Sequence, residues 1–202
     1  MTDTVLMPPE HTVPIAFTRA QLDWLPWLEP LAIEAMTERH LASLVEAARV
    51  KSPYFRLLAR DPDALEARTR TDKDIFYNPD AGLPRAEREL VAAATSRFNG
   101  CLYCASVHAR HAAIYSKREA DVQRLLDGGV TADLGERWNA LVAASVALTA
   151  TPSALGPEHV DRLRRSGFDD LAIADVIHAA AFFNWANRLM LSLGEPAATP
   201  GL

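Results

Sequence analysis

The sequence predicts an all-α fold, and its composition and periodicity both carry that prediction. Of the 202 residues, 49% are hydrophobic and 23% are charged, as in an ordinary globular domain. Alanine is abundant, which favours helices over sheets. Apolar residues recur at helical spacing, and no strand-like alternation stands out. We therefore expect a compact helical bundle in one domain, residues 37–202, preceded by an N-terminal arm, residues 1–36.

The arm is rich in proline, which restricts helix formation and favours an extended path with short turns. It also carries several large apolar side chains, including Trp24 and Trp27. So much apolar surface has to pack either on the protein's own core or on a neighbouring subunit. The prolines of the arm are Pro8, Pro9, Pro14, Pro26 and Pro30.

The first part of the bundle is expected to contain two helices. Residues 37–50 place their apolar side chains on one stripe, which predicts an amphipathic helix. A second helix is predicted over 54–71, with a break near Asp61-Pro62, because a residue before proline disfavours the helical conformation. A shorter element and a loop are expected over 72–83.

Clear start and stop signals then divide the rest of the chain. Proline is common at the first helical position, so a helix is predicted from Pro84 to Phe98, ending at Asn99-Gly100. The next helix begins around Cys101 and ends between 115 and 117. Further helices are expected over residues 120–127, 134–150, 157–166 and 171–193.

Charge and hydropathy exclude several kinds of partner. The net charge of -5 argues against a nucleic-acid partner, because nucleic-acid-binding proteins are usually basic. No apolar run approaches the ~20 residues that a membrane span needs, so no membrane partner is expected. The first nine residues lack the pattern of a secretory signal. We expect a cytoplasmic protein, in which a disulfide is usually transient and catalytic.

The chain has two cysteines, Cys101 and Cys104, and they open a predicted helix. Residues at i and i+3 of a first turn share one face, with α-carbons roughly 5 Å apart, within reach of a disulfide. The helix N-terminus favours the reactive thiolate. His108 lies one turn further on this face and can exchange a proton with a thiol, directly or through one water.

Glu89 in the preceding helix completes the predicted site. The Asn99-Gly100 turn folds that helix back on the next one, so the carboxylate can face the cysteines and relay protons through His108. A carboxylate on the inner face of an Ala-rich helix is costly unless it is paired. With these parts, a thiolate attacks a peroxide and becomes a sulfenic acid, and the second thiol condenses with it. A dithiol reductant then restores the pair.

This stretch resembles the AhpD/carboxymuconolactone decarboxylase-like superfamily, and specifically its alkylhydroperoxidase branch. The family pattern is a Glu, eleven residues, and then Cys-x-x-Cys-x-x-x-His, which Glu89, Cys101, Cys104 and His108 match without departure. The flanking residues 84–88 and 96–100 are also similar, as is the later pair Asn187-Arg188.

The resemblance implies an AhpD-like helical bundle, a homo-oligomer (trimer, hexamer or dimer) and hydroperoxide reduction without a bound cofactor. The substrate would be an organic hydroperoxide or hydrogen peroxide, and the electron donor an external dithiol, dihydrolipoyl or thioredoxin-like. By position, Cys104 would be the peroxidatic sulfur, because it neighbours His108, and Cys101 the resolving one. The decarboxylase branch lacks the cysteine pair, so its activity is not carried over.

Other interpretations of the same residues lead to different expectations. A zinc site would need Cys101, Cys104, His108 and His111, but these ligands extend roughly 15 Å along one helix, so no metal is expected. Covalent haem would need a histidine where the chain has an alanine. Tyr103, between the cysteines, is expected to line the peroxide pocket. The alternative functions are a redox-responsive regulatory oligomer, with the pair as a switch and little turnover, and a structural oligomer with inert cysteines.

Overall fold

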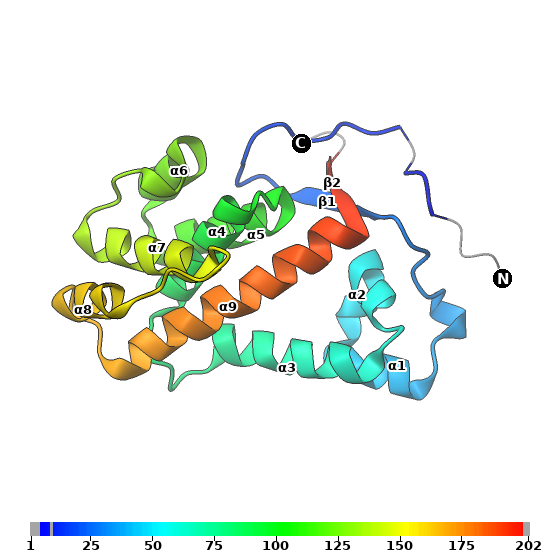
Figure 1. Cartoon of the computed structure of the whole chain (residues 1–202). Coiled ribbons are helices and arrows are strands. Elements are labelled where there is room, and N and C mark those ends of the chain that lie inside the picture. The colour runs from blue at the N-terminus through cyan, green and yellow to red at the C-terminus, as the bar shows by residue number, and fades with distance from the viewer. Residues whose placement is uncertain (1–4, 9, 200–202) are drawn as a thin grey trace.

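The structure is a computed structural model of the chain, and it describes residues 5–8 and 10–199. Within these residues it is predominantly helical, with one small two-stranded sheet, so the all-α prediction is confirmed. Figure 1 shows α9, the longest helix, crossing the molecule between α7 and α3. No helix in this described part is long and apolar enough to cross a membrane. The α-helices are α1 (Glu38–Ser43), α2 (Pro53–Leu58), α3 (Pro62–Tyr77), α4 (Arg85–Asn99), α5 (Leu102–Ser116), α6 (Glu119–Gly128), α7 (Glu136–Thr149), α8 (Pro157–Arg165) and α9 (Asp170–Leu193).

Helix α4 lies at the centre of the bundle. Every residue from Glu87 to Ser96 is buried, and the helix packs against α5, α7 and α9. Its alanines are small enough to let these neighbours approach closely. Gly100 ends the helix with a φ of 78°, a left-handed conformation that glycine adopts at little cost, and the chain reverses directly into α5. The α4–α5 pair is therefore the frame on which the cysteines are held.

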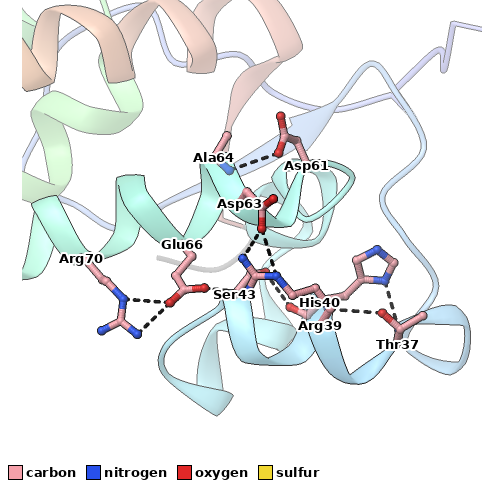
Figure 2. Close-up of polar contacts among 9 residues, drawn as sticks. All are labelled: Thr37, Arg39, His40, Ser43, Asp61, Asp63, Ala64, Glu66 and Arg70. Carbon is pink, nitrogen blue, oxygen red and sulfur yellow. Dashed lines mark hydrogen bonds and ion pairs between the residues drawn. The ribbon is translucent and has the colours of Figure 1, made fainter.

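Helix α3 is held against α1 by the polar contacts drawn in Figure 2. Arg39 on α1 forms ion pairs with Asp63 and Glu66 on α3. Thr37 and Asp61 cap the two helices by accepting hydrogen bonds from backbone N–H groups of their first turns. The ion pairs are largely exposed and contribute little to stability, but the caps fix where each helix begins.

The N-terminal arm runs over the bundle of its own chain. Its strand β1 (Leu22–Pro26) pairs antiparallel with β2 (Gly194–Ala198), which follows α9 directly (Figure 1). Trp24 of β1 is buried, and its indole N–H donates to the Met190 carbonyl at 3.2 Å. A Cβ on Gly194 would lie 2.3 Å from a backbone oxygen of β1, so this close approach requires glycine. The paired strands pack beside the N-terminal end of α5.

Most of the predicted elements are confirmed, and the exceptions have physical reasons. From residue 84 onward the predicted helices agree with the structure to within about two residues at each end. The continuous helix expected over 37–50 is wrong: α1 stops at Ser43, Val45 has a φ of 63°, and a 3-10 turn follows over Ala47–Lys51. This break buries Leu44 in a small cluster beneath α3.

Two further expectations about the elements are wrong. Helix α3 continues to Tyr77, where a shorter element and a loop were expected from residue 72. The β1–β2 pairing was missed because the two strands are far apart in the sequence, and five residues give little alternation to read. Two more short 3-10 turns lie at Ile33–Ala35 and Gly129–Thr131.

Candidate active site

The two cysteines lie side by side at the start of α5. Cys101 is the N-cap residue of the helix, and Cys104 belongs to its first turn. Both are free thiols, and both are buried. Their side chains hydrogen-bond to each other, so the sulfurs are close enough to react with one another.

The two thiols have pKa values that are shifted in opposite directions. The hydrogen bond from the Cys104 side chain lowers the pKa of Cys101 despite burial, and the backbone N–H groups of Cys104 and Tyr103 reinforce the effect. In return, the hydrogen bond to Cys101 and burial raise the pKa of Cys104 well above its usual range. When the reduced pair loses one proton, the proton therefore leaves Cys101 in preference to Cys104.

The two sulfurs also differ in what they face. Cys101 borders a cavity of about 200 Å³ between the β1–β2 ribbon and the end of α9. Cys104 does not line this cavity, although both cysteines belong to one buried cluster that also contains Tyr54 of α2. The residues lining the cavity are mostly apolar and include Trp24, Leu102, Tyr103, Met190, Leu191 and Pro196.

Glu89 and His108 meet behind the cysteines, as the α4–α5 turn predicts. His108 Nδ1 lies 2.6 Å from one carboxylate oxygen of Glu89, and Arg85 Nε donates to the other at 2.7 Å. Burial alone would raise the pKa of Glu89, but the charge and hydrogen bond of His108, followed by those of Arg85, hold that pKa below its ordinary value. Glu89 is therefore a buried, fully paired carboxylate.

The imidazole of His108 is fixed on three sides. Its ring stacks on Phe76, with 5.1 Å between the ring centroids, and meets Phe183 edge-to-face, with 4.2 Å between the centroids. Its Nδ1 contacts Glu89. Among the described residues no direct hydrogen bond joins His108 to either sulfur. With Nδ1 bonded to the carboxylate, Nε2 is the nitrogen left to exchange a proton, and its path to a sulfur needs a bridging water.

Comparison with known proteins places this arrangement in a family. The sequence profile of the Carboxymuconolactone decarboxylase family matches residues 62–147, which include Glu89, both cysteines and His108. The uncharacterized protein YdfG of Bacillus subtilis (strain 168) is 24% identical over 123 residues, which are 61% of this chain and 84% of that protein.

Solved structures show the same relationship. A peroxidase-related protein with an alkylhydroperoxidase AhpD core, from Ralstonia eutropha JMP134, is 25% identical with a TM-score of 0.68, over 81% of this chain and 87% of that chain. The family match over residues 62–147 and this structural likeness together support the AhpD-like, carboxymuconolactone decarboxylase-like superfamily for this chain.

Two more distant structures share the AhpD-like fold. A peroxidase-related protein from Silicibacter sp. TM1040 is 21% identical, with a TM-score of 0.67 over 96% of both chains. The debrominase Bmp8 is 20% identical, with a TM-score of 0.65 over 81% of this chain and 88% of its own. At these identities the likeness shows the fold alone.

The structure of this AhpD-like chain adds Asn187 to the site. Asn187 lies on α9 and is fully buried, and its side-chain hydrogen bonds lower the pKa of Cys101 and oppose the raised pKa of Cys104. Its amide is held by Ser96, to which it donates at 3.0 Å, and by Asn99, from which it accepts at 3.1 Å. In the sequence, the signal for such a role was the Asn187-Arg188 pair that the family resemblance includes.

The remaining candidates lie at different distances from the sulfurs. Tyr103 lines the cavity beside Cys101, and burial, followed by the charge of Cys104, raises the pKa of its hydroxyl. Arg188 is exposed and bonds Asn184 instead of the cysteines. Among the described residues, no group of three or more His, Cys, Asp or Glu side chains could hold a metal, so the expectation of a metal-free site stays a prediction.

Proposed function

We propose that this AhpD-like protein is a thiol-dependent hydroperoxide reductase. The observation that carries the proposal is the hydrogen-bonded thiol pair at the N-terminus of α5, next to the buried Glu89–His108 pair. The family supports a peroxidase-related or antioxidant role, and the geometry supplies groups for the individual steps. The finer assignment of residues is our proposal.

The reaction balances with the two thiols and one peroxide. A thiolate attacks the terminal oxygen of R–O–O–H, the O–O bond breaks, and R–O⁻ takes up a proton and leaves as the alcohol. The sulfur becomes a sulfenic acid, which the second thiol attacks, and water leaves as the disulfide forms. An external dithiol, dihydrolipoyl or thioredoxin-like, then reduces the disulfide by thiol–disulfide exchange.

His108 and Glu89 handle the protons of these steps. The carboxylate holds the imidazole by Nδ1, so Nε2 can pass a proton through a water to the leaving alkoxide or hydroxide. Arg85 bonds the second carboxylate oxygen and keeps Glu89 ionised, which fixes the orientation of the pair.

The roles of the two sulfurs rest on different kinds of support. The family resemblance implies Cys104 as the peroxidatic sulfur and Cys101 as the resolving one, and we retain this assignment. The resting electrostatics instead favour a thiolate at Cys101. Moving the shared proton from Cys104 to Cys101 reconciles the two, because it makes Cys104 the thiolate without any proton leaving the pair.

The test is peroxide consumption by the pre-reduced protein with a dithiol reductant, compared with Cys104→Ser and Cys101→Ser. We expect turnover to vanish in Cys104→Ser, and the wild type to lose the mass of two hydrogens. Cys101→Ser should accumulate a sulfenic acid that a dimedone-type reagent traps. A trappable sulfenic acid only in Cys104→Ser would reverse the two roles, and a disulfide without turnover would favour the redox switch.

We also propose that the protein acts as a homo-oligomer in the cytoplasm. Support for assembly comes from the outer face of α9, where Ile177 and Trp185 are large apolar side chains that remain exposed in the single chain. Sedimentation of the reduced and oxidised protein would measure the assembly and any dependence on redox state.

A further inference from the structure

Tyr54, which shares a buried cluster with Cys104, and its neighbour Arg68 carry buried polar atoms without a hydrogen-bond partner. Among the described residues, the hydroxyl of Tyr54 on α2 and the Nε and Nη1 atoms of Arg68 on α3 are buried and lack a hydrogen-bond partner. Buried donors are nearly always paired, and unpaired ones point to a ligand, a water or a catalytic role. The Arg68 Nη1 atom has only a long ion-pair contact with Asp72, at 3.5 Å, whereas the Tyr54 hydroxyl and the Arg68 Nε have no partner at hydrogen-bond distance and need an explanation.

The positive charge of Arg68 is also incompletely balanced. Its carboxylate partner is Asp72, at 3.5 Å, but Asp72 is shared with Arg49 at 3.6 Å. The other partner of Arg49 is Glu46, which also binds Lys73. Three cations thus share two carboxylates, and the side chain of Arg68 is 9% exposed, the most buried of the three cations. A buried positive charge without a full partner destabilises the fold, and an anion that binds beside it removes this cost.

Cys104 is a group that can become an anion within reach of both side chains. Tyr54 belongs to the same buried cluster as the cysteines, and the Arg68 guanidinium lies 6.0 Å from the centre of the Tyr54 ring and 5.3 Å from that of Phe182. Arg68 interacts electrostatically with Cys104, and so does Tyr54. Burial raises the pKa of Tyr54 to about 12, so its hydroxyl remains a donor.

We propose that Arg68 and Tyr54 form an anion site for Cys104, which stabilises its thiolate and, after oxidation, its sulfenate oxygen. The second half rests on the proposed peroxidase function. In that reaction Cys104–S⁻ and R–O–O–H give Cys104–S–O⁻ and R–OH, so a negative oxygen forms where the two donors lie. The site explains how Cys104, the thiol that holds the proton at rest, can become the reacting sulfur. Arg68 and Tyr54 are thus positioning residues for Cys104.

The test uses the full chain with Cys101→Ser, so that Cys104 is the only thiol and titrates alone. The other titratable or charged groups that interact with it are Tyr103, Tyr54 and Arg68. The pKa of Cys104 is measured from the ultraviolet absorbance of the thiolate. Arg68→Met should raise this pKa by about one unit or more, because an opposite charge nearby is removed. Tyr54→Phe should raise it by less.

Arg49→Met is the matched control. It removes the same charge from the other side of Asp72, with a side chain of similar burial that also packs on Phe55. Because Arg68 is a main electrostatic influence on Cys104 and Arg49 is not, this variant should shift the pKa of Cys104 by less than half as much as Arg68→Met. Equal shifts in the two variants, or no shift in Arg68→Met, would overturn the proposal.

Two features of this test keep it independent of folding and of peroxidase activity. Tyr54→Phe removes a hydroxyl without a partner, so it should fold as well as the parent and still raise the pKa. No shift in a folded Tyr54→Phe would remove Tyr54 from the site. The titration needs no peroxide, so a shifted pKa, together with a wild-type chain that consumes no peroxide, would retain the thiolate site and refute the proposed function.

Discussion

Two buried charged clusters flank the cysteine pair, and they differ in how their polar atoms are satisfied. One carboxylate oxygen of Glu89 bonds to Arg85 and the other to His108, so both oxygens in that cluster have partners within the fold, and we call it the complete cluster. Arg68 instead shares one carboxylate, Asp72, with a second arginine, and its buried Nε has no hydrogen-bond partner. The complete cluster orients a proton carrier, and the incomplete one has room for an anion that exists only during the reaction.

Removing the carboxylate of the complete cluster should have the largest effect. Glu89→Gln leaves Arg85 without its charge partner and releases the imidazole of His108 from a charged acceptor. We expect a loss of about 3 kcal/mol in unfolding free energy, at the lower end for a broken buried pair because Arg85 is partly exposed. Turnover should fall by ~10²-fold. Denaturant unfolding and peroxide consumption measure the two effects.

The pH dependence of unfolding tests the cause of that loss. The pKa of Glu89 is depressed in the folded chain, so its stabilisation is complete above the unfolded value of 4.5 and is lost as the pH falls through the lower folded value. The stability gap between wild type and Glu89→Gln should therefore shrink below pH 4.5. Glu87→Gln is the control for the loss of a buried carboxylate on the same helix. Glu87 pairs with Arg137, which is more exposed than Arg85, so this variant should leave turnover unchanged. A gap independent of pH would contradict the explanation.

Loss of the imidazole should be the next largest effect. His108→Ala removes the group that exchanges protons with the sulfurs and should slow turnover by ~10²-fold, measured as kcat with a saturating dithiol. Its stability should fall as well, because the ring packs between Phe76 and Phe183.

The control for this prediction is His111→Ala, one turn further along α5. His111 stacks on Tyr115 and is not a hydrogen-bond partner of Glu89 among the described residues, so its loss should leave kcat within a few-fold of wild type. Equal rates in the two histidine variants would remove His108 from the mechanism.

The complete cluster could be predicted from the sequence, and the incomplete one could not. Glu89 and His108 lie on two consecutive helices joined at Asn99-Gly100, and a single turn is enough to place them together. Arg68 and Tyr54 come from α3 and α2, so their position beside Cys104 depends on how distant helices pack. In the sequence, Arg68 has the pattern of a surface residue on a polar helix, and nothing local indicates its burial.

The same limit applies elsewhere in the fold. Asn187 joins the site only because α9 packs along α4, although the Asn187-Arg188 pair of the family resemblance was a usable signal. The cavity beside Cys101 depends on β1 pairing with a strand from the other end of the chain. Helix periodicity and turn signals therefore predicted the bundle, while contacts between segments far apart in sequence decided what surrounds each sulfur.

The smallest predicted effect separates an anion site from an ordinary core contact. If the Tyr54 hydroxyl serves only a transient anion, Tyr54→Phe should change the unfolding free energy of the reduced protein by less than about 0.5 kcal/mol, because no hydrogen bond is lost. The ring would keep its edge-to-face contact with Trp24 at 5.4 Å. A loss of more than about 1 kcal/mol, the usual value of a satisfied hydrogen bond, would show that the hydroxyl has a structural partner in the resting protein. The cluster of Tyr54 and Arg68 would then have its donors satisfied in the resting protein, as the cluster of Glu89 does, and would not be free to bind an anion at Cys104.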